Sequence, residues 1–324
     1  MEILKDVPLK DKNWFETGGN AKFYCTPENE SDFAKAIEFA NKNNLKIFVL
    51  GEGANILVSD DGFDGLVIHP TLKHLSIIEN EKLPIPYISK TGIKTISAGA
   101  GVKIEDLINF TLQNNLIGLE EFSGIPGSVG GSVFINIHYI DGFLGDFLVA
   151  AQLIKKNTGK LIWVDKNWFE FGYDQSKLQN QEFYIVNAIF ALKEVSPSEA
   201  AYAKGRSYEI IRHRNRRYPT SNSCGSFFRN FHADEVQVSL NGKKMIFTAY
   251  YLDKLGTRGE LKIGNAIVSP KHANMIESLP GATSTDIINL AKEMQKLVLE
   301  KFGILPQPEC ILVGFKNYPL IKEK

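Results

Sequence analysis

The stretch "GIPGSVGG", Gly124 to Gly131, decides the fold, because half of its residues are glycine. Two more glycine clusters precede it, "GEGAN" (Gly51 to Asn55) and "AGAG" (Ala98 to Gly101). Glycine adopts positive φ and lets backbone N–H groups approach a ligand, and successive N–H groups in such turns bind anions such as a pyrophosphate. Each cluster alone is typical of a tight turn. Together, with two of them directly after predicted strands, they predict a cradle for a dinucleotide.

The clusters exclude the two commonest nucleotide-binding motifs. None of them is a G-x-G-x-x-G that opens a helix, as the Rossmann fingerprint requires. None carries the lysine of a Walker A loop either.

The sequence around the clusters alternates short apolar runs with helical patterns. "SDFAKAIEFANKNNL" (31–45) has Phe33, Ile37 and Ala40 at helical spacing, and Ser31 is the expected N-cap. A second helix is predicted in "KIEDLINFTLQNNL" (103–116), and "AAQLIKKNTGKLIWV" (150–164) predicts a hairpin with its turn at 157–159. This alternation predicts an α+β or α/β domain over residues 1–195.

A basic helix is predicted to link this domain to a second one. Residues 196–219 open with a proline-serine break and end at Pro219, which halts a helix. Residues 220–324 then form the second domain, whose closing helix "STDIINLAKEMQKLVLEKFG" has Gly303 as its C-cap. Most arginines of the linker form a solvated surface, although one or two close to Pro219, such as Arg217, are candidates for binding a diphosphate.

Composition limits the possible partners. The chain has 37 basic and 37 acidic side chains, so its charge favours neither nucleic acid nor an anionic membrane. Its three cysteines lie far apart, which predicts neither a disulfide framework nor a zinc site, and no other metal site is expected. Charges interrupt every apolar run near the N-terminus, so we expect no signal peptide and a cytoplasmic protein.

The stretch "NSCGSFFRN" (222–230) places Ser226 between Gly225 and two phenylalanines. Two interpretations are open at this point. Ser226 either begins a buried strand or presents its hydroxyl to a substrate.

Five segments together carry a resemblance to a known family. They are "GEGANILVSDDGFDGLVI", "GLEEFSGIPGSVGGSV", "GSFFRN", "LKIGNAIVSPKHANMI" and "FGILPQPECILVGF", in this order. The chain resembles the UDP-N-acetylenolpyruvoylglucosamine reductase (MurB) family over residues 15–315. The resemblance implies an FAD-binding domain of the vanillyl-alcohol oxidase / p-cresol methylhydroxylase type, followed by a smaller α+β substrate-binding domain. It also implies NADPH-driven reduction of UDP-N-acetylglucosamine enolpyruvate to UDP-N-acetylmuramate, a step of peptidoglycan synthesis.

The resemblance assigns roles to individual residues. Ser226 is the expected proton donor, and Glu309 the carboxylate near the enolpyruvyl group. The candidates for binding non-covalent FAD are Gly51, Glu52, Gly53, Ala54, Asn55, Ile56, Leu57, Gly99, Gly101, Gly124, Ile125, Pro126, Gly127, Gly130, Gly131 and Ile185. The candidates for binding the substrate are Tyr173, Arg217, Arg229 and Asn230.

The sequence departs from the family pattern in two places. "FGYDQS" has Asp174 where the family has an arginine that polarises the enolpyruvyl carboxylate. Two like charges about 4 Å apart in a partly buried site repel by several kcal/mol. "NIHYIDGFLGD" (136–146) replaces a small-residue loop and contains His138, and a lone histidine in such a loop is more often structural than catalytic.

Three functional hypotheses follow. The first is an active, monomeric reductase in which another cation replaces the arginine. The second is a flavoenzyme of the same fold with a different substrate. The third is a non-catalytic FAD-binding module, which has no need of Ser226 or Glu309.

Overall fold

The computed structural model describes residues 1–79, 82–87, 90–140 and 142–322 of the chain. These residues fall into two units, which are described separately. Unit 1 comprises Met1–Lys5, Phe23–Glu52 and Gly65–Arg214, and unit 2 comprises Asp6–Lys22, Gly53–Asp64 and Asn215–Lys324.

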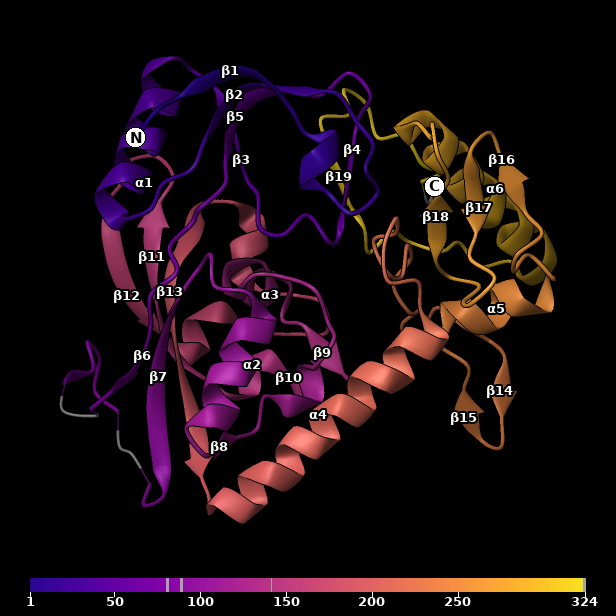
Figure 1. Cartoon of the computed structure of the whole chain (residues 1–324). Coiled ribbons are helices and arrows are strands. Elements are labelled where there is room, and N and C mark those ends of the chain that lie inside the picture. Colours follow the sequence, from indigo (N-terminus) through magenta and orange to yellow (C-terminus); the bar gives the residue numbers. More distant parts are fainter. Residues whose placement is uncertain (80–81, 88–89, 141, 323–324) are drawn as a thin grey trace. The chain divides into compact units, whose positions relative to one another are not determined.

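The elements of the described residues follow in chain order (Figure 1). The α-helices are α1 (Glu30–Lys42), α2 (Ile104–Gln113), α3 (Val129–Ile135), α4 (Pro197–Arg217), α5 (Thr248–Lys254) and α6 (Ser284–Phe302). The strands are β1 (Leu4–Pro8), β2 (Asn20–Cys25), β3 (Lys46–Val49), β4 (Ile56–Val58), β5 (Phe63–Ile68), β6 (Leu75–Ile78), β7 (Ile93–Gly99), β8 (Leu116–Ile117), β9 (His138–Tyr139), β10 (Gly142–Phe143), β11 (Leu148–Lys155), β12 (Leu161–Asp165), β13 (Phe183–Glu194), β14 (Ser239–Leu240), β15 (Lys243–Lys244), β16 (Lys262–Ile263), β17 (Ala266–Val268), β18 (Ile276–Ser278) and β19 (Ile311–Val313). Short 3-10 helices are η1 (Lys10–Lys12), η3 (Glu120–Phe122), η4 (Leu144–Asp146), η5 (Lys166–Phe169) and η6 (Lys177–Asn180).

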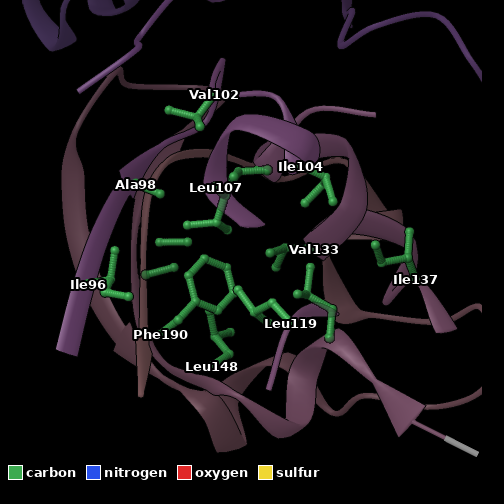
Figure 2. Close-up of a cluster of buried hydrophobic side chains, with 14 of the residues drawn as sticks. Ile96, Ala98, Val102, Ile104, Leu107, Leu119, Val133, Ile137, Leu148 and Phe190 are labelled. Carbon is green, nitrogen blue, oxygen red and sulfur yellow. The ribbon is translucent and has the colours of Figure 1, made fainter. Parts of the chain in front are cut away.

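The largest sheet of unit 1 has the strand order β12-β11-β13-β7-β6, and β8 also pairs with β13. All of its pairings are antiparallel. Helices α2 and α3 cover one face of this sheet, where Ile96, Ala98 and Phe190 pack against Leu107 and Val133 (Figure 2). This apolar core holds the segments around α2 and α3, which include two of the three glycine clusters.

The other sheet to which unit 1 contributes has the strand order β1-β2-β5-β3, with β3 parallel to β5. Helix α1 packs its buried residues Phe33, Ile37 and Ala40 on this part of the core. The N-cap prediction for this helix was wrong. Asn29 is the cap, because its side-chain oxygen accepts the N–H of Asp32 at 2.9 Å, which places Ser31 inside the first turn.

Unit 2 is built around α6 and the antiparallel strands β16, β17 and β18. Strand β19 pairs in parallel with β4, from much earlier in the chain, which explains why residues 53–64 belong to this unit. Asp60 also caps α6, since its carboxylate accepts the N–H groups of Ser284 and Thr285 at 2.8 and 3.0 Å.

Several sequence predictions are confirmed. The hairpin is β11–β12, with Gly159 at φ 64° in its turn. The basic helix is α4, and α6 ends at Gly303 with φ 70°. The structure divides the two units inside α4, between Arg214 and Asn215, and it groups residues 6–22 and 53–64 with the C-terminal unit rather than with the N-terminal one.

Candidate active site

In unit 2, the segment that contains Ser226 is hydrogen-bonded on both sides. The N–H of Phe227 donates to the carbonyl of Asn274 at 2.8 Å, and the N–H of Arg229 donates to the carbonyl of Gln307 at 2.9 Å. Isolated antiparallel bridges join Ser226 to Met275 and Phe228 to Pro308. The backbone around Ser226 is therefore fixed by two segments that are distant in sequence.

The local sequence explains this conformation. Phe227 and Phe228 are fully buried in the core of unit 2 and anchor the segment. Gly225 precedes them at φ 80°, a left-handed conformation that favours glycine, and a Cβ at this position would meet no atom within 4 Å. Glycine is thus needed here for its backbone angle. Ser226 itself is only half-buried, so its hydroxyl is not sealed in the core.

The side chain of Asn274 holds the same segment a second time. Its amide nitrogen donates to the carbonyl of Phe228 at 2.7 Å, and its oxygen accepts the N–H of Phe228 at 3.2 Å. Asn274 is 2% exposed, so these two bonds form away from water. The sequence analysis did not single out this residue, although it lies in the segment "SPKHANMI" that carries part of the resemblance.

Glu309 lies on the other side of this segment. The N–H groups of Glu309 and Cys310 both donate to the carbonyl of Phe227, at 2.9 and 3.2 Å. Two successive N–H groups on one carbonyl form the pattern of a β-bulge, a feature that re-aims side chains next to active sites. The structure thus brings Ser226 and Glu309, which are far apart in sequence, onto adjacent hydrogen-bonded segments.

Buried thiols lie beside this bulge. Cys224 and Cys310 are both buried and unoxidised. Burial, the neighbouring Cys224 thiol and the charge of Glu309 raise the pKa of Cys310 well above its usual value. The thiol is therefore neutral at physiological pH and acts as an apolar side chain under the segment.

The first glycine cluster contacts the same region of unit 2 through Asn55. The carbonyl of Asn55 accepts the N–H of Ile311 at 3.0 Å, and its amide nitrogen lies 3.4 Å from the carbonyl of Glu309. The Oδ1 atom of Asn55 is buried and has no hydrogen bond within the described residues. A buried amide oxygen of this kind is suited to accept a donor from a bound group.

The candidate substrate-binding residues of unit 2 differ in their surroundings. The guanidinium of Arg229 binds both carboxylate oxygens of Glu235, at 2.8 and 2.6 Å, and this bond lowers the pKa of Glu235. The Oδ1 atom of Asn230 lies 3.4 Å from the N–H of Thr248. The guanidinium of Arg217 lies over the ring of Tyr218, at 5.8 Å. Arg229 therefore already has a carboxylate partner within the chain.

In unit 1, parts of all three glycine clusters converge. The N–H of Gly130 donates to the carbonyl of Ala100 at 2.9 Å, which joins the second cluster to the third. A Cβ on Gly51 would lie 2.5 Å from the hydroxyl of Ser128, which brings the first cluster to the third. Lys103 also pairs with Glu52 at 3.5 Å. This convergence is the arrangement that the sequence predicted for a cradle.

The glycines in these clusters have different structural reasons. A Cβ on Gly99 or Gly101 would lie 2.3 Å or 2.5 Å from the carbonyl oxygen of Leu72 or Pro70, so the packing of the chain itself requires these glycines. Gly124 and Gly127 have φ of 75° and 155°. Gly53 combines φ 66° with close approach to Lys12.

The remaining candidates for the cofactor are distributed over both units. Gly130 belongs to helix α3 and has no positive φ, so the backbone argument applies to Gly127 and not to Gly130. Ile125 and Pro126 are half-buried, and Gly131 is exposed. Ile185 is buried in β13, while Ala54, Asn55, Ile56 and Leu57 belong to unit 2.

The residues present fit a bound FAD in two respects. The glycine clusters expose backbone where a Cβ would otherwise intrude, and Asn55 offers a buried, unpaired acceptor. Among the described residues no group of three or more His, Cys, Asp or Glu side chains could hold a metal ion. No helix of the described part is long and apolar enough to cross a membrane.

Tyr173 lies in unit 1 beside both departures from the family pattern. Its ring centroid is 4.6 Å from that of His138, and His138 Nδ1 lies 3.2 Å from Asp174 Oδ1. The sequence analysis treated Asp174 and His138 as separate changes. The structure shows that they form a contact pair.

The comparisons with known proteins agree with this organisation. A family model described as "FAD binding domain" matches residues 21–165, and one described as "UDP-N-acetylenolpyruvoylglucosamine reductase, C-terminal domain" matches residues 217–313. UDP-N-acetylenolpyruvoylglucosamine reductase from Caldicellulosiruptor saccharolyticus is 30% identical, over 99% of this chain and 95% of the relative. UDP-N-acetylenolpyruvoylglucosamine reductase 2 from Bacillus cereus is 31% identical, over 96% and 93%.

A solved structure shows the same similarity. UDP-N-acetylenolpyruvylglucosamine reductase (MurB) from Thermus caldophilus superposes with a TM-score of 0.72 and 26% identity, covering 97% of this chain and 99% of that one. The expected order, an FAD-binding domain followed by a C-terminal domain of this kind, is confirmed. The chain belongs to the UDP-N-acetylenolpyruvoylglucosamine reductase family.

Proposed function

We propose that this chain reduces UDP-N-acetylglucosamine enolpyruvate to UDP-N-acetylmuramate, with NADPH as the reductant and non-covalent FAD as the cofactor. The names of its relatives support the substrate, and the matched FAD-binding domain supports the cofactor. A single observation carries the proposal. Ser226 and Glu309 are held on adjacent segments by the bonds to Phe227, in a member of this family.

The reaction divides into a hydride transfer and a proton transfer. Bound FAD supplies the hydride chemistry, which converts the enolpyruvyl CH₂ group into a methyl group. The electron pair of the double bond then resides on the neighbouring Cα and its carboxylate, and Cα must take a proton. We assign this proton to the hydroxyl of Ser226.

A serine hydroxyl is a weak acid, so its position must compensate. A fixed backbone and a donor within hydrogen-bond reach of Cα give a general acid its effect. The bonds of Phe227 and Phe228 to Asn274 fix the backbone next to Ser226. We assign to Glu309 a role beside the reacting enolpyruvyl group. The presence of both residues disfavours a non-catalytic FAD-binding module.

The other candidate residues keep narrower roles in this proposal. Tyr173, Asn230 and Arg217 are proposed to contact the substrate, and Arg217 to contact its diphosphate. Arg229 is proposed to act from within its pair with Glu235. A cytoplasmic location and a monomeric state stay predictions.

One anaerobic experiment tests the proposed function. The purified, FAD-loaded protein is reduced with NADPH, the excess nucleotide is removed, and the enolpyruvyl sugar nucleotide is added. We expect the flavin absorbance to return and a product heavier by two hydrogens to form. A reduced flavin that the compound does not reoxidise would contradict the proposal.

A further inference from the structure

The pair formed by His138 and Asp174 in unit 1 is built from two short backbone features. His138 lies in β9, whose pairing with β10 places His138 opposite Phe143. Asp174 lies in a tight turn in which Gly172 and Gln175 exchange hydrogen bonds of 3.1 and 3.3 Å. The side chain of Gln179 also donates to the carbonyl of Asp174 at 2.8 Å. Both partners are thus fixed by the backbone.

The carboxylate of Asp174 is poorly solvated. Its side chain is 14% exposed, and the backbone holds it at φ 51°, a conformation rare for residues other than glycine. Its Oδ2 atom is buried without a hydrogen bond from the described residues. A buried carboxylate needs a charged partner. Within the described part of the chain, its ion pair is with His138.

This ion pair fixes which nitrogen of His138 faces other groups. Nδ1 lies 3.2 Å from Asp174 Oδ1 and donates to it. The ring packs on Tyr173 and lies 5.7 Å from the ring of Phe143. Nε2 makes no hydrogen bond to the described residues, and the side chain is 25% exposed. A protonated His138 therefore directs a second N–H outward, beside Tyr173.

The surrounding charges leave this donor without a competing anion other than Asp174. Glu121 on η3 pairs with Arg206, Asp146 on η4 accepts the N–H of Phe143, and Glu120 accepts the N–H of Gly118. On β9 itself, the Tyr139 ring is covered by Arg214 of α4, at 5.7 Å. These acidic groups have bonds of their own, and the arginine adds positive charge to the neighbourhood.

We propose that His138, held in its protonated form by Asp174, donates Nε2–H to the carboxylate of the enolpyruvyl substrate. The inference rests on the proposed function and adds a specificity-determining residue to it. Two sequence changes then have one explanation, since Asp174 supplies the charge that keeps His138 cationic. The substrate carboxylate meets the imidazolium rather than the aspartate.

The test compares two ligands that differ by the carboxylate-bearing group. Calorimetry measures binding of the enolpyruvyl sugar nucleotide and of UDP-N-acetylglucosamine to the oxidised, FAD-loaded protein. The variants are His138→Gln and Asp174→Asn, and His213→Gln on the exposed face of α4 is the control. Each is measured at about pH 6 and about pH 8.5, a range in which histidine side chains change charge.

We expect His138→Gln to weaken binding of the enolpyruvyl compound by about 10- to 100-fold, the range of a hydrogen bond to a charged group. Binding of UDP-N-acetylglucosamine stays unchanged. In the wild type the preference for the enolpyruvyl compound declines from pH 6 to pH 8.5, and in His138→Gln it is smaller and independent of pH. Asp174→Asn reduces the preference most strongly at the higher pH. His213→Gln behaves as the wild type.

The outcomes separate this inference from the proposed function. If the wild type prefers the enolpyruvyl compound and His138→Gln keeps both that preference and its pH dependence, the inference is overturned alone. A loss of thermal stability in His138→Gln with an unchanged preference shows a purely structural pair and also overturns it. If the wild type binds both ligands equally, the proposed function and the inference both fail.

Discussion

Replacing Asn274 with alanine tests whether the double hold on the Ser226 segment supports catalysis. The side chain makes two hydrogen bonds to the backbone of Phe228, and both residues are buried. Truncation leaves the N–H and the carbonyl of Phe228 without partners. Each unpaired buried group costs about 1–3 kcal/mol, so we expect the free energy of unfolding to fall by about 2–4 kcal/mol in total.

Denaturant unfolding and stopped-flow spectroscopy measure the two consequences. In the Asn274→Ala variant, flavin reduction by NADPH should keep its rate, and reoxidation by the enolpyruvyl compound should slow by about 10-fold or more, because the proton donor loses its fixed position. Asn114→Ala is the control, since this exposed side chain also donates to one backbone carbonyl, that of Phe110. It should change stability by no more than about 0.5 kcal/mol. An Asn274→Ala protein with wild-type stability and reoxidation would refute the reasoning.

Three further changes test other parts of the structure. Asp60→Ala should lower stability by about 1 kcal/mol through loss of its cap on α6. Burial opposes ionisation of Asp60, but hydrogen bonds from Ser284 and Thr285 outweigh it and hold its pKa below the usual value, so this stabilisation is present at neutral pH and disappears as the pH falls below about 4; equal effects at pH 7 and pH 3 in denaturant titrations would contradict it. Gly127→Val should abolish flavin retention on gel filtration because φ 155° is strained for valine, whereas Gly205→Ala on α4, which has open space around it, should retain the flavin. Glu309→Gln should slow reoxidation and leave reduction by NADPH nearly intact, and equal losses in both half-reactions would reassign Glu309 to flavin positioning or stability.

The elements with strong local signals were predictable from sequence. The periodic apolar residues of α6 and its terminal Gly303, the β11–β12 hairpin and the proline-limited α4 all follow from local pattern and capping. The N-cap of α1 was not, because both Asn29 and Ser31 are good capping residues. Only the bond from Asp32 to Asn29 distinguishes them.

Contacts between distant segments were not predictable from local pattern. The pairing of β4 with β19 joins residues about 250 positions apart and moves residues 53–64 into unit 2. The bonds of Asn274 and the bulge at Glu309 are of the same kind, since each partner taken alone is an ordinary polar residue. The pair of His138 with Asp174 was missed for this reason too, although both residues stand where the sequence departs from its family.

The most direct test of the account is the rate of flavin reoxidation in Ser226→Ala. The protein is reduced anaerobically with NADPH in a stopped-flow instrument and then mixed with the enolpyruvyl sugar nucleotide. We predict normal flavin content and reduction, reoxidation slower by about 10²-fold or more, and partial recovery in Ser226→Cys, whose thiol also donates a proton. Reoxidation at the wild-type rate in Ser226→Ala would remove Ser226 from the mechanism and contradict the account.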